Sequence, residues 1–192
     1  MKVHFDRARK NQKFTKLQET GIEGCFLAQK AVFEDKHGSF HRAFQKSILD
    51  ESGVGFAIRE VLVSTSARNV LRGLHYQAAP RSTTKLVVCI SGEVFDAVVD
   101  LRKNSPSYLK TFTVRLSEDE DTMIYIPEGV AHGFYTLRDS TILYLTSGVF
   151  SAAHDSGILW NSAGIEWPTD DPIVSERDRN LIPLHEYAAQ QV

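Results

Sequence analysis

Short runs of β-branched and aromatic residues, each ended by turn residues, follow one another along the chain from Ile22 onward. Between them stand turn-forming segments such as Ser91-Gly92. Strands of this length at this spacing are typical of an all-β sandwich or barrel. The runs cover residues 28–33, 56–66, 84–90, 93–101, 108–116, 122–126, 132–137 and 141–149. The sequence therefore predicts an all-β fold, with short helices only near residues 47–52 and Glu176.

Two of these runs differ in how their polar residues are spaced. In residues 93–100 the polar side chains do not keep to one face, which predicts a strand inside a sheet that is buried on both sides. Residues 111–116 alternate strictly between polar and apolar, as expected for a strand with one face in solvent. The two patterns predict a sheet whose strands are unequally exposed.

The overall composition limits the class of protein. The chain contains no internal repeat or linker, so we expect one domain over residues 1–192, with residues 1–20 as an N-terminal extension. A formal net charge of -2 argues against broad electrostatic capture of nucleic acid. Cys25 and Cys89 lack CxxC spacing, as expected for reduced thiols. No apolar stretch approaches the roughly 18 residues of a membrane span. We therefore expect a soluble cytoplasmic protein that binds neither nucleic acid nor membrane.

Two of the seven histidines, His75 and His132, lie in strand-like sequence contexts. Metal-binding jelly rolls commonly present two histidines at positions i and i+2 of one strand, then a carboxylate and a third histidine. Gln77 stands where the second histidine would be, whereas residues 127–133, around His132, match the later half of the pattern. Half of the ligand set is missing, so the sequence predicts a site without a metal or another cofactor.

Such a polar set suits proton transfer. Histidine is the side chain best suited to act as a base near neutral pH, so His75 is the candidate base. A cation such as Lys85 or Arg72 can hold the negative charge that develops on a carbonyl oxygen. Chemistry of this kind needs no cofactor when the substrate supplies its own electron sink.

The chain resembles the dTDP-4-dehydrorhamnose 3,5-epimerase family in a set of motifs that follow one another in the family's order. The first is Asn-Val-Leu-Arg-Gly-Leu-His-Tyr-Gln at residues 69–77. The others lie at residues 85–87, 92–96, 99–106, 126–134, 157–161, 165–168 and 175–178. The resemblance spans roughly residues 24–184. It implies a double-stranded β-helix, the cupin-like jelly roll, assembled as a homodimer whose N-terminal strands cross to the partner.

The resemblance also implies a reaction, a step of deoxysugar and polysaccharide biosynthesis. The family inverts carbons beside the C4 ketone of a nucleotide-linked 4-keto-6-deoxyhexose, here dTDP-4-keto-6-deoxyglucose, through an enolate. By position, His75 corresponds to the base and Asp178 to the carboxylate that orients its imidazole. Tyr144 corresponds to the acid on the opposite face and Lys85 to the enolate stabiliser. A neighbouring positive charge is expected to lower the pKa of Tyr144 so that it can donate.

The substrate-binding residues that the resemblance implies surround the same motifs. They are Arg72 and His132 at the sugar and diphosphate end, Asp96 as support for that network, and Gln77, Glu60, Phe40 and Phe150. Three places depart from the family's pattern: His37 replaces an arginine, Glu60 and Leu62 replace a Gln-x-Asn pair, and Val149 replaces an aromatic residue. Intact catalytic positions beside altered recognition positions predict an epimerase with changed specificity.

Several alternatives stay open. A C3-only or C5-only mono-epimerase, or a 3,4-ketoisomerase, would form the same enolate on a dTDP-, GDP- or CDP-linked sugar. A protein of another class, a non-catalytic sugar-binding jelly roll, would not need the catalytic set. Structural roles are also available: Ser175 and Asp178 have the spacing of a helix cap, Tyr144 can fill a core, and Lys85 can protect a sheet edge.

Overall fold

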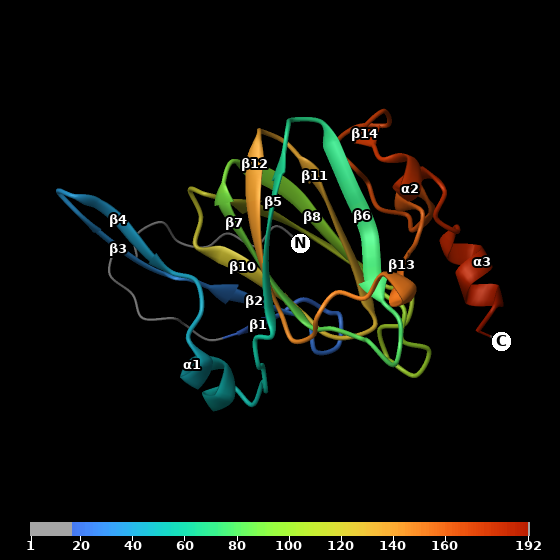
Figure 1. The fold of residues 1–192 in the computed structure, drawn as a ribbon, viewed down its shortest axis with the longest axis horizontal. Helices are drawn as coiled ribbons and strands as arrows, with labels where there is room; N and C mark the ends of the chain where they lie inside the picture. The colour runs from blue at the N-terminus through green and yellow to red at the C-terminus, as the bar shows by residue number, and fades with distance from the viewer. Residues whose placement is uncertain (1–16, 192) are drawn as a thin grey trace.

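A computed structural model describes residues 17–191, which form two facing β-sheets with short helices at the periphery (Figure 1). The first sheet contains, in pairing order, β1 (Gln18–Glu19), β2 (Phe26–Gln29), β10 (Thr122–Ile126), β7 (Lys85–Ser91), β12 (Ser140–Thr146) and β5 (Glu60–Ser66). The second contains β13 (Asp155–Gly157), β6 (Val70–Gln77), β11 (Val130–Thr136), β8 (Glu93–Asp100) and β9 (Thr111–Ser117), and β14 (Ile173–Val174) pairs with β6. The N-terminal extension expected over residues 1–20 lies mostly outside the described residues.

The core lies between the two sheets. Val87 and Ile124 of the first sheet pack in one buried cluster with Val98 and Phe134 of the second. All four side chains are at most 2% exposed, so each sheet buries one face against the other. This architecture confirms the predicted all-β jelly roll.

Most predicted runs contain a strand, but β4 (Gly38–Arg42), β6, β13 and β14 lie outside these runs, and two runs differ from the strands observed. The strand expected at residues 122–126 is present as β10. The run at residues 28–33 differs, because it is divided between β2 and β3 (Ala31–Asp35). The strand expected to begin at Phe56 begins at Glu60, because Phe56 packs with Leu49 over the outer face of the first sheet. The expectations for exposure are confirmed: β8 is almost wholly buried between β11 and β9, and β9 alternates along most of its length.

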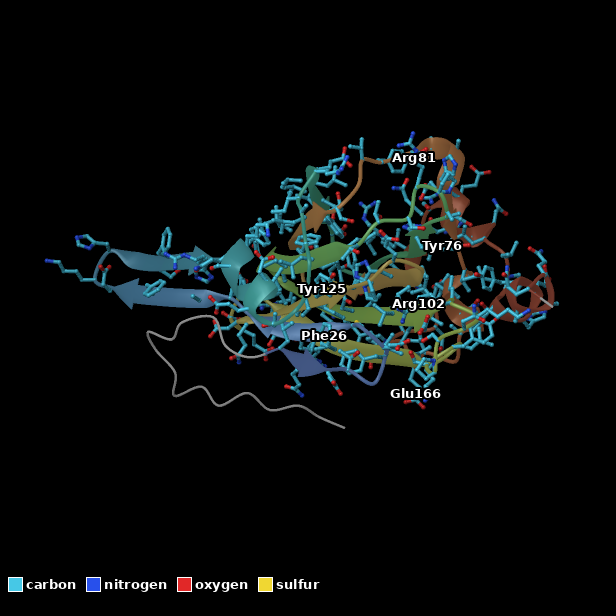
Figure 2. The ribbon with its side chains drawn as sticks, turned by 90° about the horizontal axis from the view of Figure 1, so that it is seen from below. Phe26, Tyr76, Arg81, Arg102, Tyr125 and Glu166 are labelled. Carbon is cyan, nitrogen blue, oxygen red and sulfur yellow. The ribbon has the colours of Figure 1, made fainter. Side chains whose placement is uncertain are left out.

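The outer face of the first sheet is covered at one end. The helix expected near residues 47–52 is α1 (Lys46–Glu51), whose Leu49 is buried in this cover. Phe56 stacks edge-on against Tyr125, and Tyr125 lies 6.1 Å from the ring of Phe26 (Figure 2). No helix in the described part of the chain is long and apolar enough to cross a membrane.

A two-stranded hairpin projects from the body of the molecule, as Figure 1 shows at the left. It consists of β3 and β4 (Gly38–Arg42), and every residue of β4 is exposed. The rings of Phe33 and Phe40 lie 6.2 Å apart across the hairpin, and the Arg42 guanidinium lies 5.9 Å from the Phe33 ring. Phe40 is 61% exposed, so its side chain is available for contacts outside the described chain.

The C-terminal segment returns to the second sheet. β13 and β14 both pair with β6, and α2 (Glu176–Arg179) follows directly after β14. The helical turn expected near Glu176 is therefore confirmed, whereas α3 (Leu184–Ala189) was not predicted. The 3-10 turns Ala152–His154 and Trp160–Ser162 complete this segment. Its course places residues 155–178 beside the strand that carries His75.

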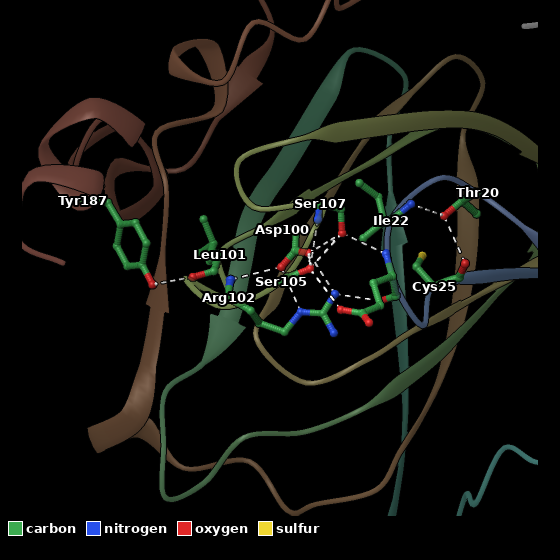
Figure 3. Close-up of polar contacts among 10 residues, drawn as sticks. Thr20, Ile22, Cys25, Asp100, Leu101, Arg102, Ser105, Ser107 and Tyr187 are labelled. Carbon is green, nitrogen blue, oxygen red and sulfur yellow. Dashed lines mark hydrogen bonds and ion pairs between the residues drawn. The ribbon is translucent and has the colours of Figure 1, made fainter. Parts of the chain in front are cut away.

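A buried carboxylate stabilises the turn after β8. Asp100 is completely buried and accepts hydrogen bonds from Arg102, Ser105 and Ser107 at 2.6–3.0 Å (Figure 3). Burial alone would raise the pKa of Asp100, but these hydrogen bonds outweigh it and lower the pKa to about 2. Arg102 also donates to the backbone carbonyl of Glu23, which connects this turn to the segment before β2.

Candidate functional site

His75 and Asp178 form a close pair beside the second sheet. Nε2 of His75 lies 2.7 Å from Oδ1 of Asp178, and Oδ2 of Asp178 accepts the backbone N–H of Gly73 at 3.1 Å. Burial alone would raise the pKa of Asp178, but the hydrogen bond and charge of His75, the Gly73 amide and Arg177 together lower it. The ionised carboxylate therefore accepts from His75 and orients the imidazole.

The helix cap expected from the spacing of Ser175 and Asp178 is also present. The Ser175 side chain accepts the backbone N–H of Asp178 at 3.1 Å and begins α2. The cap uses the backbone of Asp178 and leaves its carboxylate directed at His75. Asp178 can therefore take part in the helix cap and contact His75 at the same time.

A close approach of β6 and β11 brings two histidines side by side. His132 is the register partner of His75, and the register then shifts before Phe134. The shift marks a β-bulge, a feature that redirects side chains along a strand. Gly73 has a φ of +122°, and a Cβ there would lie 2.5 Å from Cα of Gly133. Only glycine fits this contact, which is why the motif needs a glycine two residues before His75.

His132 forms a second, deeper pair with Asp96. Nε2 of His132 lies 2.7 Å from Oδ2 of Asp96, and neither residue is more than 4% exposed. Burial raises the pKa of Asp96 although His132 opposes the effect. Oδ1 of Asp96 has no hydrogen-bond partner among the described residues. The resemblance implied that Asp96 supports the network of Arg72 and His132. In the structure, Asp96 contacts His132 directly.

Lys85 begins β7, as predicted, and is half-buried. Its ammonium donates to the backbone carbonyl of His75 at 3.4 Å, which places a positive charge beside His75. Burial lowers the pKa of Lys85 to about 8, because a charged amine loses hydration in the protein interior. The side chain is therefore still mainly cationic at neutral pH.

Tyr144 lies on β12, across the space between the sheets from β6. Its hydroxyl lies 3.3 Å from the hydroxyl of Ser64, and its ring lies 6.3 Å from that of His132. The expectation that a positive charge lowers the pKa of Tyr144 is wrong. Burial raises the pKa to about 12, and the opposing effect of Arg72 is smaller. Tyr144 is therefore a protonated donor throughout the neutral range.

These side chains surround one cavity of about 350 Å³ between the sheets. Eight of the predicted residues line it: His75, Lys85, Tyr144, Arg72, His132, Gln77, Glu60 and Phe150. Asp178 and Asp96 lie behind the lining and contact the two histidines. Phe40 is on the projecting hairpin and does not line the cavity. The structure thus brings together every predicted site residue except Phe40.

Of the positions that depart from the family's pattern, Glu60 and Leu62 line the cavity, whereas His37 lies at the turn of the projecting hairpin. Leu62 and Phe150 line the cavity, and Val149 is exposed beside it. Glu60 accepts the backbone N–H of Phe150 at 3.0 Å, and Gln77 accepts that of Ser151 at 2.7 Å. Glu60 and Gln77 therefore hold the segment after β12 in place as well as lining the cavity.

Two charged residues of the site were missed by the sequence analysis. Arg177 and Asp155 line the cavity and form an ion pair of 2.5 Å. Arg177 also lies 3.9 Å from the Asp178 carboxylate. Arg177 lies within the motif at residues 175–178, but nothing in the spacing of the chain indicates that β13 brings Asp155 to it.

Within residues 17–191, no group of three or more His, Cys, Asp or Glu side chains has an arrangement that could hold a metal ion.

The sequence and the fold of this chain are both similar to those of known proteins. The family model described as dTDP-4-dehydrorhamnose 3,5-epimerase matches residues 19–186. The enzyme of that name from Methanothermobacter thermautotrophicus is 41% identical over 174 residues, which cover 88% of this chain and 94% of the relative. A crystal structure of the Bacillus anthracis enzyme with TDP and pyrophosphate bound has a TM-score of 0.84 at 39% identity, covering 88% of this chain and 99% of that one. The 4-keto-6-deoxy sugar epimerase of Streptomyces spheroides has a TM-score of 0.89 at 31% identity, covering 95% and 93%.

Proposed function

We propose that the substrate of this protein is dTDP-4-keto-6-deoxyglucose and that the enzyme inverts C3 and C5. The premise is that the chain belongs to the dTDP-4-dehydrorhamnose 3,5-epimerase family and is a nucleotide-sugar epimerase, which is an isomerase. The observation that carries the proposal is the arrangement around one cavity of a histidine–carboxylate pair, a lysine ammonium and a protonated tyrosine. A solved relative from Legionella pneumophila holds dTDP-4-keto-L-rhamnose, a sugar of this class.

The proposed reaction begins at a C–H bond beside the C4 ketone. The ketone acidifies this bond, and His75, oriented by Asp178, removes the proton. The electron pair moves onto the ketone oxygen, where the ammonium of Lys85 stabilises the enolate. Tyr144 then donates its proton to the same carbon from the opposite face, so the configuration is inverted. One proton enters His75 and one leaves Tyr144, and exchange with water restores both groups.

The decisive test is proton NMR of the sugar during turnover in D2O. Deuterium at both C3 and C5 supports double epimerisation, whereas deuterium at one carbon identifies a mono-epimerase. Migration of the ketone to C3 would identify a 3,4-ketoisomerase. Exchange only with a GDP- or CDP-linked analogue would overturn the nucleotide assignment. Binding without any exchange on these sugars would favour the non-catalytic sugar-binding class.

The pH dependence of kcat/KM provides a prediction for Lys85. The pKa of about 8 means that the ammonium is lost as the pH rises through 8, so activity is expected to fall about tenfold per unit above that pH. Lys85→Arg keeps the positive charge and should remove this alkaline decrease, even if its kcat is lower at pH 7. The measurement is kcat/KM between pH 6 and about 10. Lys110→Arg, an exposed substitution of the same kind, is the control. An unchanged decrease in Lys85→Arg would exclude Lys85 as its origin.

We further propose that a single domain over residues 1–192 works in the cytoplasm as a homodimer. The projecting hairpin of β3 and β4 supports the homodimer, since Phe33 and Phe40 are both exposed. In the dimer, Phe40 would contribute to the cavity of the other subunit. Analytical ultracentrifugation of the protein and of Phe40→Ser measures the assembly, and a monomeric wild type at micromolar concentration would exclude it.

A further inference from the structure

The ion pair between Arg177 and Asp155 takes no part in the proposed proton transfers. Nη2 of Arg177 lies 2.5 Å from Oδ2 of Asp155, and the two side chains are 47% and 19% exposed. Both line the cavity together with Lys85. A surface ion pair contributes little to stability, with a median of about 0–1 kcal/mol. The position of this pair inside the site therefore calls for a role other than stabilisation.

Strand β6 determines where the pair lies relative to Lys85. Asp155 is the register partner of Gln77 on β6, and Lys85 donates to the carbonyl of His75 on the same strand. Arg177 immediately precedes Asp178, whose carboxylate contacts His75. Both charges are thus held at the same end of β6 as the ammonium of Lys85.

Asp155 is the carboxylate with the strongest electrostatic effect on Lys85. Its charge favours the ammonium, Arg177 opposes it, and Asp96 favours it more weakly. The other titratable or charged groups that line the cavity are Arg72, His75 and Tyr76 on β6, His132 on β11, Tyr144 on β12 and Glu60 on β5. Within the described residues, Lys85 forms no ion pair, and its amine donates to the His75 carbonyl. Asp155 instead directs its carboxylate to Arg177.

We propose that Arg177 is a positioning residue that holds Asp155 away from Lys85, so that the lysine ammonium stays free for the oxygen of the enolate. The inference rests on the proposed function, in which Lys85 stabilises that oxygen. An arginine guanidinium suits this task because it stays charged and binds a carboxylate with directed N–H groups. Without Arg177, the carboxylate of Asp155 would attract Lys85, and a lysine in an ion pair is a poorer partner for the substrate.

The test compares Arg177→Met, Asp155→Asn and the double variant, with Arg179→Met on the same helix as the control. Arg177→Met is expected to lower kcat roughly tenfold and to move the alkaline decrease of activity about one pH unit upward, since Asp155 now stabilises the ammonium. Asp155→Asn leaves Arg177 uncompensated and should move the decrease downward. The double variant should recover kcat to within about threefold of the wild type, because the competing carboxylate is gone.

A second readout does not depend on turnover. Acetic anhydride modifies only the neutral amine, so the rate of Lys85 acetylation as a function of pH, followed by mass spectrometry, reports the charge of Lys85 directly. We expect the midpoint to rise in Arg177→Met, to fall in Asp155→Asn and to return in the double variant. If the double variant stays as slow as Arg177→Met, Arg177 acts through substrate or Asp178 and the inference is overturned. If the proposed function itself fails, the wild type shows no turnover, while the acetylation measurement still tests the charge coupling.

Discussion

Replacing His75 with asparagine is expected to lower kcat roughly 10³-fold, while KM changes little. The amide has about the same reach as the imidazole but cannot accept a proton from carbon near neutral pH. Because Asp178 accepts from Nε2–H of His75, the other ring nitrogen carries the lone pair needed for proton abstraction. The measurement combines steady-state kinetics with the rate of deuterium uptake by the substrate.

The control is His185→Asn, which alters an exposed histidine of α3 outside the cavity and should leave kcat unchanged. Asp178→Asn provides a second variant that removes the charge but keeps the shape of the side chain. It is expected to lower kcat by at least tenfold, since the imidazolium formed during the reaction loses its counter-charge. Wild-type exchange in folded His75→Asn would show that another group is the base.

Replacing Asp100 with asparagine is expected to lower the free energy of unfolding by about 3 kcal/mol. The change leaves two hydroxyl donors and the Arg102 guanidinium without the charged acceptor that they share. In a chain of this length such a loss corresponds to a decrease in Tm of roughly 6–12 °C. Urea denaturation and thermal unfolding measure the effect. Asp119→Asn is the control, because its partner Arg138 is a surface contact of 3.1 Å and its own side chain is 66% exposed.

The stabilisation by Asp100 should depend on pH with a definite sign. Its pKa is about 2 in the folded protein against an ordinary value of 3.8. The contribution is therefore present above pH 4 and is lost as the pH falls toward 2. The difference in stability between the wild type and Asp100→Asn should shrink over that range. A difference that is constant with pH would mean that the charge of Asp100 is not its source.

The sequence predicted most strands because their signal is local. Alternation and turn residues are properties of short segments, so β8, β9 and β10 could be recognised one at a time. The prediction was wrong at Phe56. Its side chain is not part of a strand but packs with other apolar residues over the outer face of the first sheet. An apolar residue indicates burial, but the surface that buries it is a tertiary property.

The site was predictable only where the resemblance supplied the pairing. The order of motifs placed Asp178 with His75, although the residues lie 103 positions apart. The pair of Arg177 and Asp155 was missed because its two members belong to different segments that meet only when β13 and α2 pack beside β6. The direction of the pKa shift of Tyr144 was also wrong, since the sequence gives no measure of how deeply a strand residue is buried.

The distance along the chain between His75 and Asp178 has a consequence for biosynthesis. A ribosome completes β6 about 100 residues before it adds α2, at roughly 5–20 residues per second. A nascent chain therefore carries the imidazole for several seconds without the carboxylate that orients it. The histidine–carboxylate pair can therefore form only after nearly the whole chain has been synthesised.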